Sequence, residues 1–299
     1  MTTSVTMRRN SSHARSRSLP SISHPTVSKA EELLCRLRSS EAVRSSPSAS
    51  SSSICHDLVD LNNLYECVED LLQLPLTQQS LTGQDRNSKW FDQVLDESLM
   101  LLDVCGTTRD VLLEMKESVQ DLESSFRRRK CGESVLSEVA AYNSSRKKMN
   151  KVISKCLGDL KRVDNTTTNN NNSALLEEEP EVASIIRQVE GITHSIFESI
   201  LSLSIGSKAR SNTIGGWSLV SKMMHTKSFS SHEKATSVSE IEKVEIALKS
   251  LSCKEIDIRE VQKQLVGLEI SIQGFEDGLE CVFRHLMRHR VSLLNILSY

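Results

Sequence analysis

The chain contains few of the residues that build loops and sheets. Its 299 residues include 5 prolines and 11 glycines, and only 4 % of them are aromatic. A loop-rich or all-β protein needs more turn residues than this, and no run of alternating β-branched residues indicates a strand. With 38 % apolar residues, the chain suits long amphipathic helices better than a sheet-based core.

The signatures of common enzyme sites are also missing. There is no Gly-x-Ser-x-Gly elbow, no His-Glu-x-x-His motif and no glycine-rich phosphate loop between a strand and a helix. The carboxylates of Glu177 and Glu179 fall in a polar segment, where nothing would raise a carboxyl pKa for acid–base work. We therefore expect a protein that is not an enzyme, with no catalytic residue and no cofactor.

The cysteines and the hydropathy favour a cytoplasmic location. The 8 cysteines are scattered and include no C-x-x-C pair, which favours reduced thiols over a disulfide framework. No stretch reaches the ~20 uncharged apolar residues of a membrane helix. Residues 1–30 are rich in Arg and Ser and contain no acidic residue, so a plastid transit peptide stays open as an alternative.

A seven-residue apolar repeat runs almost to the last residue. Its gaps alternate between four and three, with one interruption at His289. We call it the C-terminal stripe; its members are Ile258, Val261, Leu265, Leu268, Ile272, Phe275, Leu279, Val282, Leu286, Leu293 and Ile296. This spacing places all of these side chains on one side of an α-helix. At about 1.5 Å per residue such a helix is roughly 60 Å long and needs long partner helices.

A second long repeat lies between Phe91 and Phe126. Its 3–4 phase passes Gly106 without slipping, which predicts one continuous helix over residues 88–129; a break at the glycine is the alternative. Because these are the two longest apolar stripes, we expect this helix to lie against the C-terminal helix. The fold class that results is all-α: an elongated bundle of long antiparallel amphipathic helices.

The composition divides the chain into four parts. Residues 1–53 are expected to be a disordered, basic, Ser/Arg-rich tail with one short helix from Ser28. Residues 54–164 form the N-terminal helical part of the bundle, and residues 181–299 form the C-terminal helical part. Between them, residues 165–180 begin with an Asn- and Thr-rich tract and predict a low-complexity linker.

Smaller signals suggest where individual helices begin and end. Ser53 can cap a helix, and Pro75 would end it because proline lacks the amide hydrogen. Residues 133–163 predict the next helix. The polar residues 206–237 are expected to be irregular, and a further helix is expected from Ser239.

Several separate segments resemble one plant-specific family. They are Arg17-Ser-Leu-Pro20, Leu71-Leu-Gln-Leu-Pro-Leu-Thr-Gln-Gln79, Leu101-Leu-Asp-Val-Cys-Gly-Thr-Thr108, Gly216-Trp-Ser-Leu-Val-Ser-Lys222, and Gly278-Leu-Glu-Cys281 with Arg290-Val-Ser-Leu-Leu-Asn-Ile-Leu297. In this order they are similar to domain-of-unknown-function family 241, which is related to the BYPASS proteins. The resemblance implies an all-helical fold, no assigned catalytic activity and a role in root and shoot development. It supplies no catalytic residue.

The predicted tail carries a phosphorylation motif. Arg15, Arg17, Ser18 and Pro20 fit the R-S-x-S-x-P pattern that 14-3-3 proteins read when the second serine is phosphorylated. A phosphoserine brings nearly two negative charges and three acceptor oxygens, which suit an arginine cluster in a partner's groove. The alternative is a solvated tail without partners. Our hypothesis is a non-catalytic regulatory or scaffolding protein in plant root and shoot development, which acts through protein–protein contacts and this motif.

Two basic runs support a second hypothesis. Arg127–Lys130 and Arg146–Lys155 could meet anionic lipid headgroups, which would make the protein a peripheral membrane protein. Aromatic residues that stack on bases are nearly absent nearby, and the net charge is only -2, so we expect no nucleic-acid partner. Solvated faces are the favoured interpretation of both runs. A third hypothesis, an enzyme or regulator of small-molecule signal production, rests on the BYPASS kinship alone.

Two patterns in the C-terminal helix have structural interpretations. Cys281, His285 and His289 are four residues apart, but steps of four drift around the helix and neighbouring arginines repel a cation, so we expect no metal. His289 is interpreted as a polar residue that specifies helix register. Gly274 and Gly278 would let a partner helix approach closely. The C-terminal stripe is also long enough to close on a second copy, so a homo-oligomer stays open.

We expect Leu279→Asp or Leu286→Asp to unfold or aggregate the protein, because each substitution buries a charge in the C-terminal stripe. Far-ultraviolet circular dichroism and thermal melting measure the effect. Near-unchanged helicity and melting in both variants would mean that the stripe is not buried.

Overall fold

The computed structural model describes residues 24–44, 50–82, 87–128, 133–171, 181–205, 239–252 and 258–298. These residues form eight helices and no strand, which confirms the all-α fold. The helices are α1 (Pro25–Arg44), α2 (Ser51–Leu72), α3 (Pro75–Thr82), α4 (Asn87–Arg128), α5 (Glu133–Asn171), α6 (Glu181–Ile205), α9 (Glu240–Ser252) and α10 (Ile258–Leu297). In the described ranges, no helix combines the length and the apolarity needed to cross a membrane.

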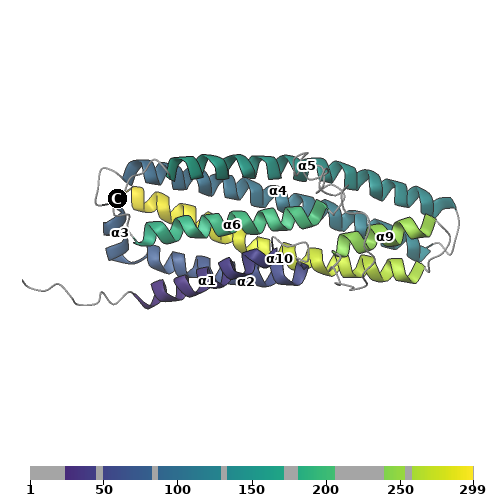
Figure 1. The fold of residues 1–299 in the computed structure, drawn as a ribbon, viewed down its shortest axis with the longest axis horizontal. Coiled ribbons are helices and arrows are strands. Elements are labelled where there is room, and N and C mark those ends of the chain that lie inside the picture. Colours follow the sequence, from purple (N-terminus) through teal and green to yellow (C-terminus); the bar gives the residue numbers. More distant parts are fainter. Residues whose placement is uncertain are drawn as a thin grey trace, which may run out of the picture.

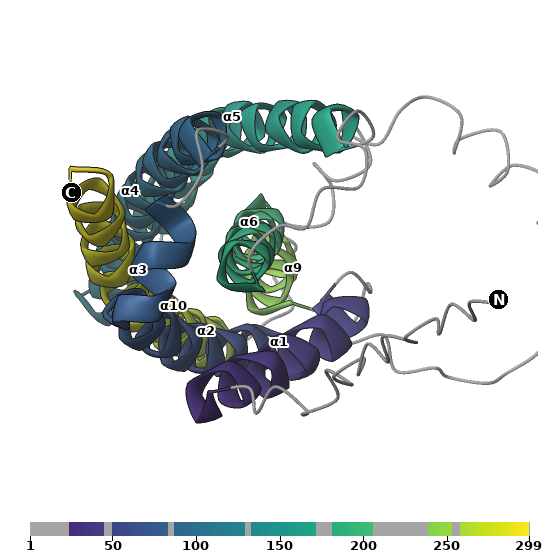
Figure 2. The ribbon, with the colours of Figure 1, turned by 90° about the vertical axis from the view of Figure 1, so that its left-hand side faces the viewer.

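The long helices share one long axis (Figure 1). Viewed along that axis, α5, α4, α10, α2 and α1 form an arc, and α6 and α9 lie inside it (Figure 2). α6 contacts α1, α2, α4 and α5, while α9 packs on α10. The core therefore sits between the arc and the inner helices.

α10 and α4 lie side by side, as predicted from their long apolar stripes. The Nζ atom of Lys116 lies 2.6 Å from a carboxylate oxygen of Glu276. Nearer the end of α10, the guanidinium of Arg290 donates to the backbone carbonyl of Leu95. Because the later residue of α10 meets the earlier residue of α4, the two helices are antiparallel. α4 is continuous through Gly106, so the predicted unbroken helix is observed.

The C-terminal stripe faces the core of the bundle. Its members from Val261 to Ile296 are all buried, and Ile258 is partly buried against the core. His289, which interrupts the stripe, is buried with them.

The contact between α10 and α2 depends on two glycines. A Cβ atom on Gly274 would lie 2.8 Å from the sulfur of Cys55, and a Cβ atom on Gly278 would lie 2.7 Å from Leu58 Cδ1 and 3.0 Å from Leu58 Cβ. Carbon atoms repel one another strongly at these distances, so larger residues at either position would push the helices apart. The glycine pair thus permits the close approach that its spacing suggests.

α6 is buried on nearly every side. Of its 25 residues 16 are buried, and only Glu181 and Gly191 are exposed. The sequence predicts one amphipathic helix here, with a single apolar row: Val182, Ile185, Val189, Ile192, Ile196, Ile200 and Leu203. A second row of buried residues, which includes Ile186, Phe197 and Leu201, lies beside this predicted row. A helix that is apolar nearly all round belongs inside a bundle. α6 is therefore an inner helix.

Residues 25–44 differ from the predicted tail. Instead of a short helix from Ser28, α1 begins at Pro25 and has 20 residues. Proline suits this position because the first turn of a helix has no partner for its amide hydrogens. α1 packs on α2 and α6 with one apolar face: Val27, Ala30, Leu33, Leu34 and Leu37. The bundle therefore begins near residue 25, and residues 1–23 lie outside the described residues.

The start of α2 differs from the prediction, whereas its end at Leu72, before Pro75, agrees with it. α2 begins at Ser51, and its N-cap is Ser50, whose side chain accepts a hydrogen bond from the backbone nitrogen of Ser53 at 3.2 Å. Ser53, the cap predicted from the sequence, therefore donates the hydrogen bond, and Ser50 is the cap. Pro75 follows the end of α2 and opens the short helix α3, again at a first-turn position that proline tolerates.

α5 runs on into the segment predicted as a linker. It ends at Asn171, although the sequence predicts the linker from residue 165. Each residue added to an existing helix gains a backbone hydrogen bond, and Asn and Thr cost well under about 1 kcal/mol each relative to Ala. At the start of α9, Ser239 Oγ accepts from the backbone nitrogen of Glu242 at 3.3 Å, as expected for a helix cap. The segment 206–237 lies outside the described residues.

We expect Gly278→Ala to destabilise the protein by about 1–3 kcal/mol, because the added carbon overlaps Leu58, which is itself fully buried. The matched control is Gly106→Ala. Nothing lies within 4 Å of a Cβ atom there, so better helix propensity should stabilise the protein by up to about 1 kcal/mol. Urea unfolding measures both variants. Equal unfolding midpoints would contradict the close packing of α2 on α10.

Candidate functional site

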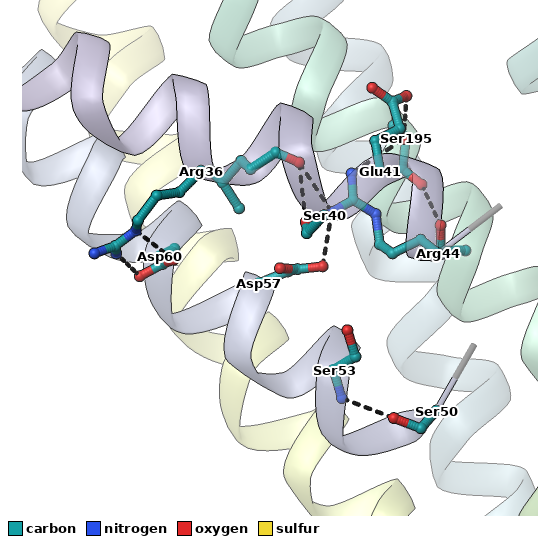
Figure 3. Close-up of polar contacts among 11 residues, drawn as sticks. Arg36, Ser40, Glu41, Arg44, Ser50, Ser53, Asp57, Asp60 and Ser195 are labelled. Atoms are coloured by element: carbon teal, nitrogen blue, oxygen red, sulfur yellow. Dashed lines mark hydrogen bonds and ion pairs between the residues drawn. The ribbon is translucent and has the colours of Figure 1, made fainter. Parts of the chain in front are cut away.

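A buried arginine fastens α1 to the bundle (Figure 3). The side chain of Arg44, the last residue of α1, has 0 % exposure, and its Nη1 atom donates to Asp57 Oδ2 on α2 at 2.7 Å. The same atom donates to Ser40 Oγ at 2.6 Å. The Nη2 atom donates to Ser195 Oγ on α6 at 3.4 Å. One side chain therefore joins three helices.

Two further contacts surround this junction (Figure 3). Ser195 Oγ donates to Glu41 at 2.8 Å, and Arg36 forms an exposed ion pair with Asp60. The exposed pair is worth about 0–1 kcal/mol. The Arg44 pair differs because it is out of water, and removing one partner of a buried pair costs about 3–5 kcal/mol. The buried pair is therefore the contact that most strongly determines how α1 docks.

The docked α1 limits how far the predicted phosphorylation motif can lie from the bundle. Arg15, Arg17, Ser18 and Pro20 lie outside the described residues. Pro25 follows the second serine by seven positions, and an extended chain spans at most about 3.5 Å per residue. A partner bound at Ser18 would therefore sit within about 25 Å of the start of α1.

A second polar cluster lies between α2, α6 and α10. The hydroxyls of Tyr65 and Thr193 share a hydrogen bond of 2.9 Å. The Tyr65 ring stacks on His285 at 6.0 Å and meets His289 edge-on at 6.1 Å. Nearer the surface, His285 Nδ1 lies 2.7 Å from Glu69 Oε1. These contacts tie three helices together through aromatic rings and hydrogen bonds.

The structure separates the three residues whose spacing resembles a metal site. Cys281 is exposed, whereas His285 is buried beside Tyr65. His289 is 2 % exposed, and neither of its ring nitrogens has a hydrogen-bond partner. Burial lowers the pKa of His289 to about 4, so its imidazole is neutral at physiological pH. In the part of the chain that is described, no group of three His, Cys, Asp or Glu side chains could hold a metal ion.

Glu190 places a carboxyl group inside the bundle. Its residue exposure is 5 %, and its side chain interacts with that of Glu97 on α4. Burial raises the pKa of Glu190 well above its ordinary value of 4.5, and the carboxylate of Glu97 on α4 raises it further. Both effects disfavour a second negative charge here. The site therefore favours the protonated, neutral acid.

A surface groove of about 470 Å³ runs between the end of α2 and α10. It is lined by Glu69, Asp70, Gln73, Met287, Arg288, Val291 and Ser292. Glu69 already contacts His285 at 2.7 Å, and Arg288 lies 3.9 Å from its other oxygen. A carboxylate held between two cationic or polar neighbours is a poor general base. The groove is therefore a weak candidate for catalysis.

The buried cysteines are poor nucleophiles. Burial raises the pKa of Cys105 to about 12 and that of Cys156 to about 11. The thiolate is the reactive form, so these two residues are held in the unreactive thiol form. The pKa of Cys55 is raised as well, by burial and then by nearby acidic groups.

The basic run at residues 146–155 contains one buried cation and four exposed ones. Arg146 Nη2 donates to the last two carbonyls of α6, at residues 204–205, over 2.9 and 3.3 Å. It also lies 3.9 Å from Glu245 of α9, and a cation is favoured at a helix C-terminus. The exposed cations are Lys147, Lys148, Lys151 and Lys155. In the other run, Arg127 pairs with Glu123 at 2.5 Å.

Comparison with known proteins identifies a family. Residues 57–296 match the family model described as Protein BPS1. The chain belongs to the BPS1 family. This match confirms the resemblance to a BYPASS-related family, and it leaves α1 outside the matched region. No curated protein and no solved structure matches the chain.

In this member of the BPS1 family, the buried polar residues are the ones that sequence reasoning missed. The composition assigns Arg44 to the predicted tail, although Asp57 offers a signal. It lies three residues after Ile54 and next to Leu58, on the apolar face of α2, where a carboxylate needs a partner. Glu190 offers none, because it stands beside the predicted row of α6 where a solvent-facing acid would be expected.

We expect Glu190→Gln to stabilise the protein at neutral and alkaline pH. The raised pKa of Glu190 means that the folded chain binds its proton more tightly than the unfolded chain. The bound proton therefore adds to the free energy of unfolding. This stabilisation is complete below the ordinary pKa of Glu190 and is lost as pH rises through its pKa in the folded chain. Glutamine mimics the neutral acid and removes this loss.

Thermal melting across the pH range measures the difference between wild type and variant. It should be small in acid and should grow as pH rises. Titration of His289 changes the stability of both proteins equally, so its effect cancels in the difference. The matched control is Glu181→Gln, an exposed carboxylate on the same helix, which should follow wild type. A constant difference for Glu190→Gln at every pH would contradict the assignment.

Proposed function

We propose that this protein is a non-catalytic scaffolding or regulatory protein of plant root and shoot development, located in the cytoplasm. It acts through protein–protein contacts on its helical surfaces and through phosphorylated Ser18, which a 14-3-3 protein would bind. Membership of the BPS1 family supports the developmental role.

The observation that carries the proposal is the docking of α1 by Arg44. A phosphoserine motif regulates a protein only when its capture affects the rest of the molecule. The motif precedes α1 directly, and α1 is packed on α2 and α6. Capture of the tail therefore holds the partner against the α1 side of the bundle, where it can cover helical surfaces that other proteins would use.

The described side chains support a non-catalytic role. The buried thiols favour their unreactive form, Glu190 favours its neutral form, and Glu69 in the surface groove is already engaged. Production of a small-molecule signal would need activated groups that converge on a pocket. The groove between α2 and α10 offers none of that kind.

Anionic lipid is the less favoured partner. The exposed lysines of α5 suit lipid headgroups, but the solvent face of the adjoining α4 carries a row of acidic residues: Asp92, Asp96, Asp103, Asp110, Glu114, Glu117 and Asp121. α4 and α5 are in contact along their length. An anionic bilayer that attracted one helix would repel its neighbour.

The full-length chain with phosphoserine incorporated at residue 18 tests the proposal. We expect it to bind a purified 14-3-3 protein at least about tenfold more tightly than the unmodified chain, since the phosphate completes the recognised charge pattern. The matched control carries phosphoserine at Ser16, in the same tail with the same added charge. Isothermal titration calorimetry measures both. Equal binding of the two phosphorylated chains, or of the unmodified chain, would rule out Ser18 as the recognised residue.

A further inference from the structure

Two helices on the outside of the arc carry opposite charges. We call the exposed acids of α4 the acidic ridge: Asp92, Asp96, Asp103, Asp110, Glu114, Glu117 and Asp121. We call the exposed cations of α5 the basic ridge: Lys147, Lys148, Lys151 and Lys155. No member of either ridge forms an ion pair with another described residue. Both rows of charge are therefore available to a partner.

The two ridges lie at the same height along the bundle. Ser145 of α5 is 3.0 Å from Ser118 Oγ and 3.2 Å from Glu114 of α4. The helices are antiparallel, and both rise about 1.5 Å per residue. Ser145 is level with residue 116, midway between Glu114 and Ser118. Six residues further along α5, Lys151 is therefore level with Asp110, six residues earlier on α4. The centre of the acidic ridge thus stands beside the basic ridge, on the next helix.

Large apolar side chains are also exposed beside both ridges, including Leu99 of α4, which is 47 % exposed. Leu113 of α4 is 51 % exposed, and Val152 of α5 is 46 % exposed. Leu113 is nearly level with Lys148 by the same count. Apolar side chains within a charged surface are typical of an interface core with a polar rim.

We propose that this surface binds a second copy of the chain, with a two-fold axis that runs parallel to the helices. A two-fold axis in that direction places α4 of one copy opposite α5 of the other and keeps heights along the axis unchanged. The acidic ridge of each copy then faces the basic ridge of its partner, with Asp110 opposite Lys151. Leu113 and Val152 lie within the same interface, about 6 Å apart along the axis.

The charges select this axis over the alternative. A two-fold axis across the helices would place α4 on α4 and α5 on α5, which brings like charges together and costs affinity. The stretch of the acidic ridge from Asp103 to Asp121 is roughly 27 Å long at 1.5 Å per residue, and the basic ridge faces roughly 12 Å at its centre. Across two helices this gives roughly 500–600 Å² from each copy, which places the dimer at the weak, salt-sensitive end of specific interfaces.

Sedimentation velocity of the full-length chain tests the proposal. We expect a concentration-dependent dimer at about 0.05 M salt that weakens at about 0.5 M, where charge interactions are screened. Reversal of the basic ridge (Lys147→Glu, Lys148→Glu, Lys151→Glu and Lys155→Glu) should raise the dissociation constant by at least about tenfold. Circular dichroism confirms that the variant is folded.

A charge swap provides the matched control. Adding Asp103→Lys, Asp110→Lys, Glu114→Lys and Glu117→Lys to the reversed chain restores the wild-type net charge and exchanges the ridges, so the dimer should return. A wild-type chain that stays monomeric, a dimer that ignores the reversal, or a swapped chain that does not recover would overturn the proposal. So would a monomer that floats with vesicles containing anionic lipid and loses flotation on lysine reversal.

Discussion

The burial of α6 is the constraint on which the rest of the structure depends. This helix is apolar on more than one side, so it can leave water only when several helices surround it. α1, α2, α4 and α5 all contact it. The arc formed by these helices with α10 follows from that requirement (Figure 2), and α9 continues the inner layer beyond the end of α6 (Figure 1).

Polar groups inside the bundle determine how the helices align. Apolar stripes can slide along one another by a turn at modest cost, whereas a buried hydrogen bond is satisfied at one register only. Arg44 sets the position of α1 through Asp57, and Tyr65 ties α2 to α6 through Thr193. Arg146 plays the same part where α6 ends. In this bundle, specificity comes from a few polar contacts and stability from the apolar stripes.

The sequence predicts the helices with long repeats well, because a 3–4 phase held over ten turns fits no regular structure except a helix. α4 and α10, and their contact, follow from that phase alone. The sequence assigns α1 to a tail because serines and arginines are interspersed among its apolar residues. The docking of α1 depends on the ion pair between Arg44 and Asp57, which only the tertiary fold brings together. Glu190 is missed for a similar reason: what makes it unusual is its burial among the surrounding helices and, after that, the presence of Glu97 on α4. The family match shows which proteins this chain is related to. The proposals about its partners rest on its exposed charges.

The contacts of Arg146 have a consequence for how this chain can vary. The arginine holds the end of α6 and approaches Glu245 of α9, and Ser204 and Glu240 line one small hollow between the same helices. The backbone thus departs and returns at neighbouring points. Because the end of α6 and the start of α9 lie close together, a change in the length of the chain between them need not move either helix. Evolution can lengthen or shorten residues 206–238 there while the bundle keeps its shape.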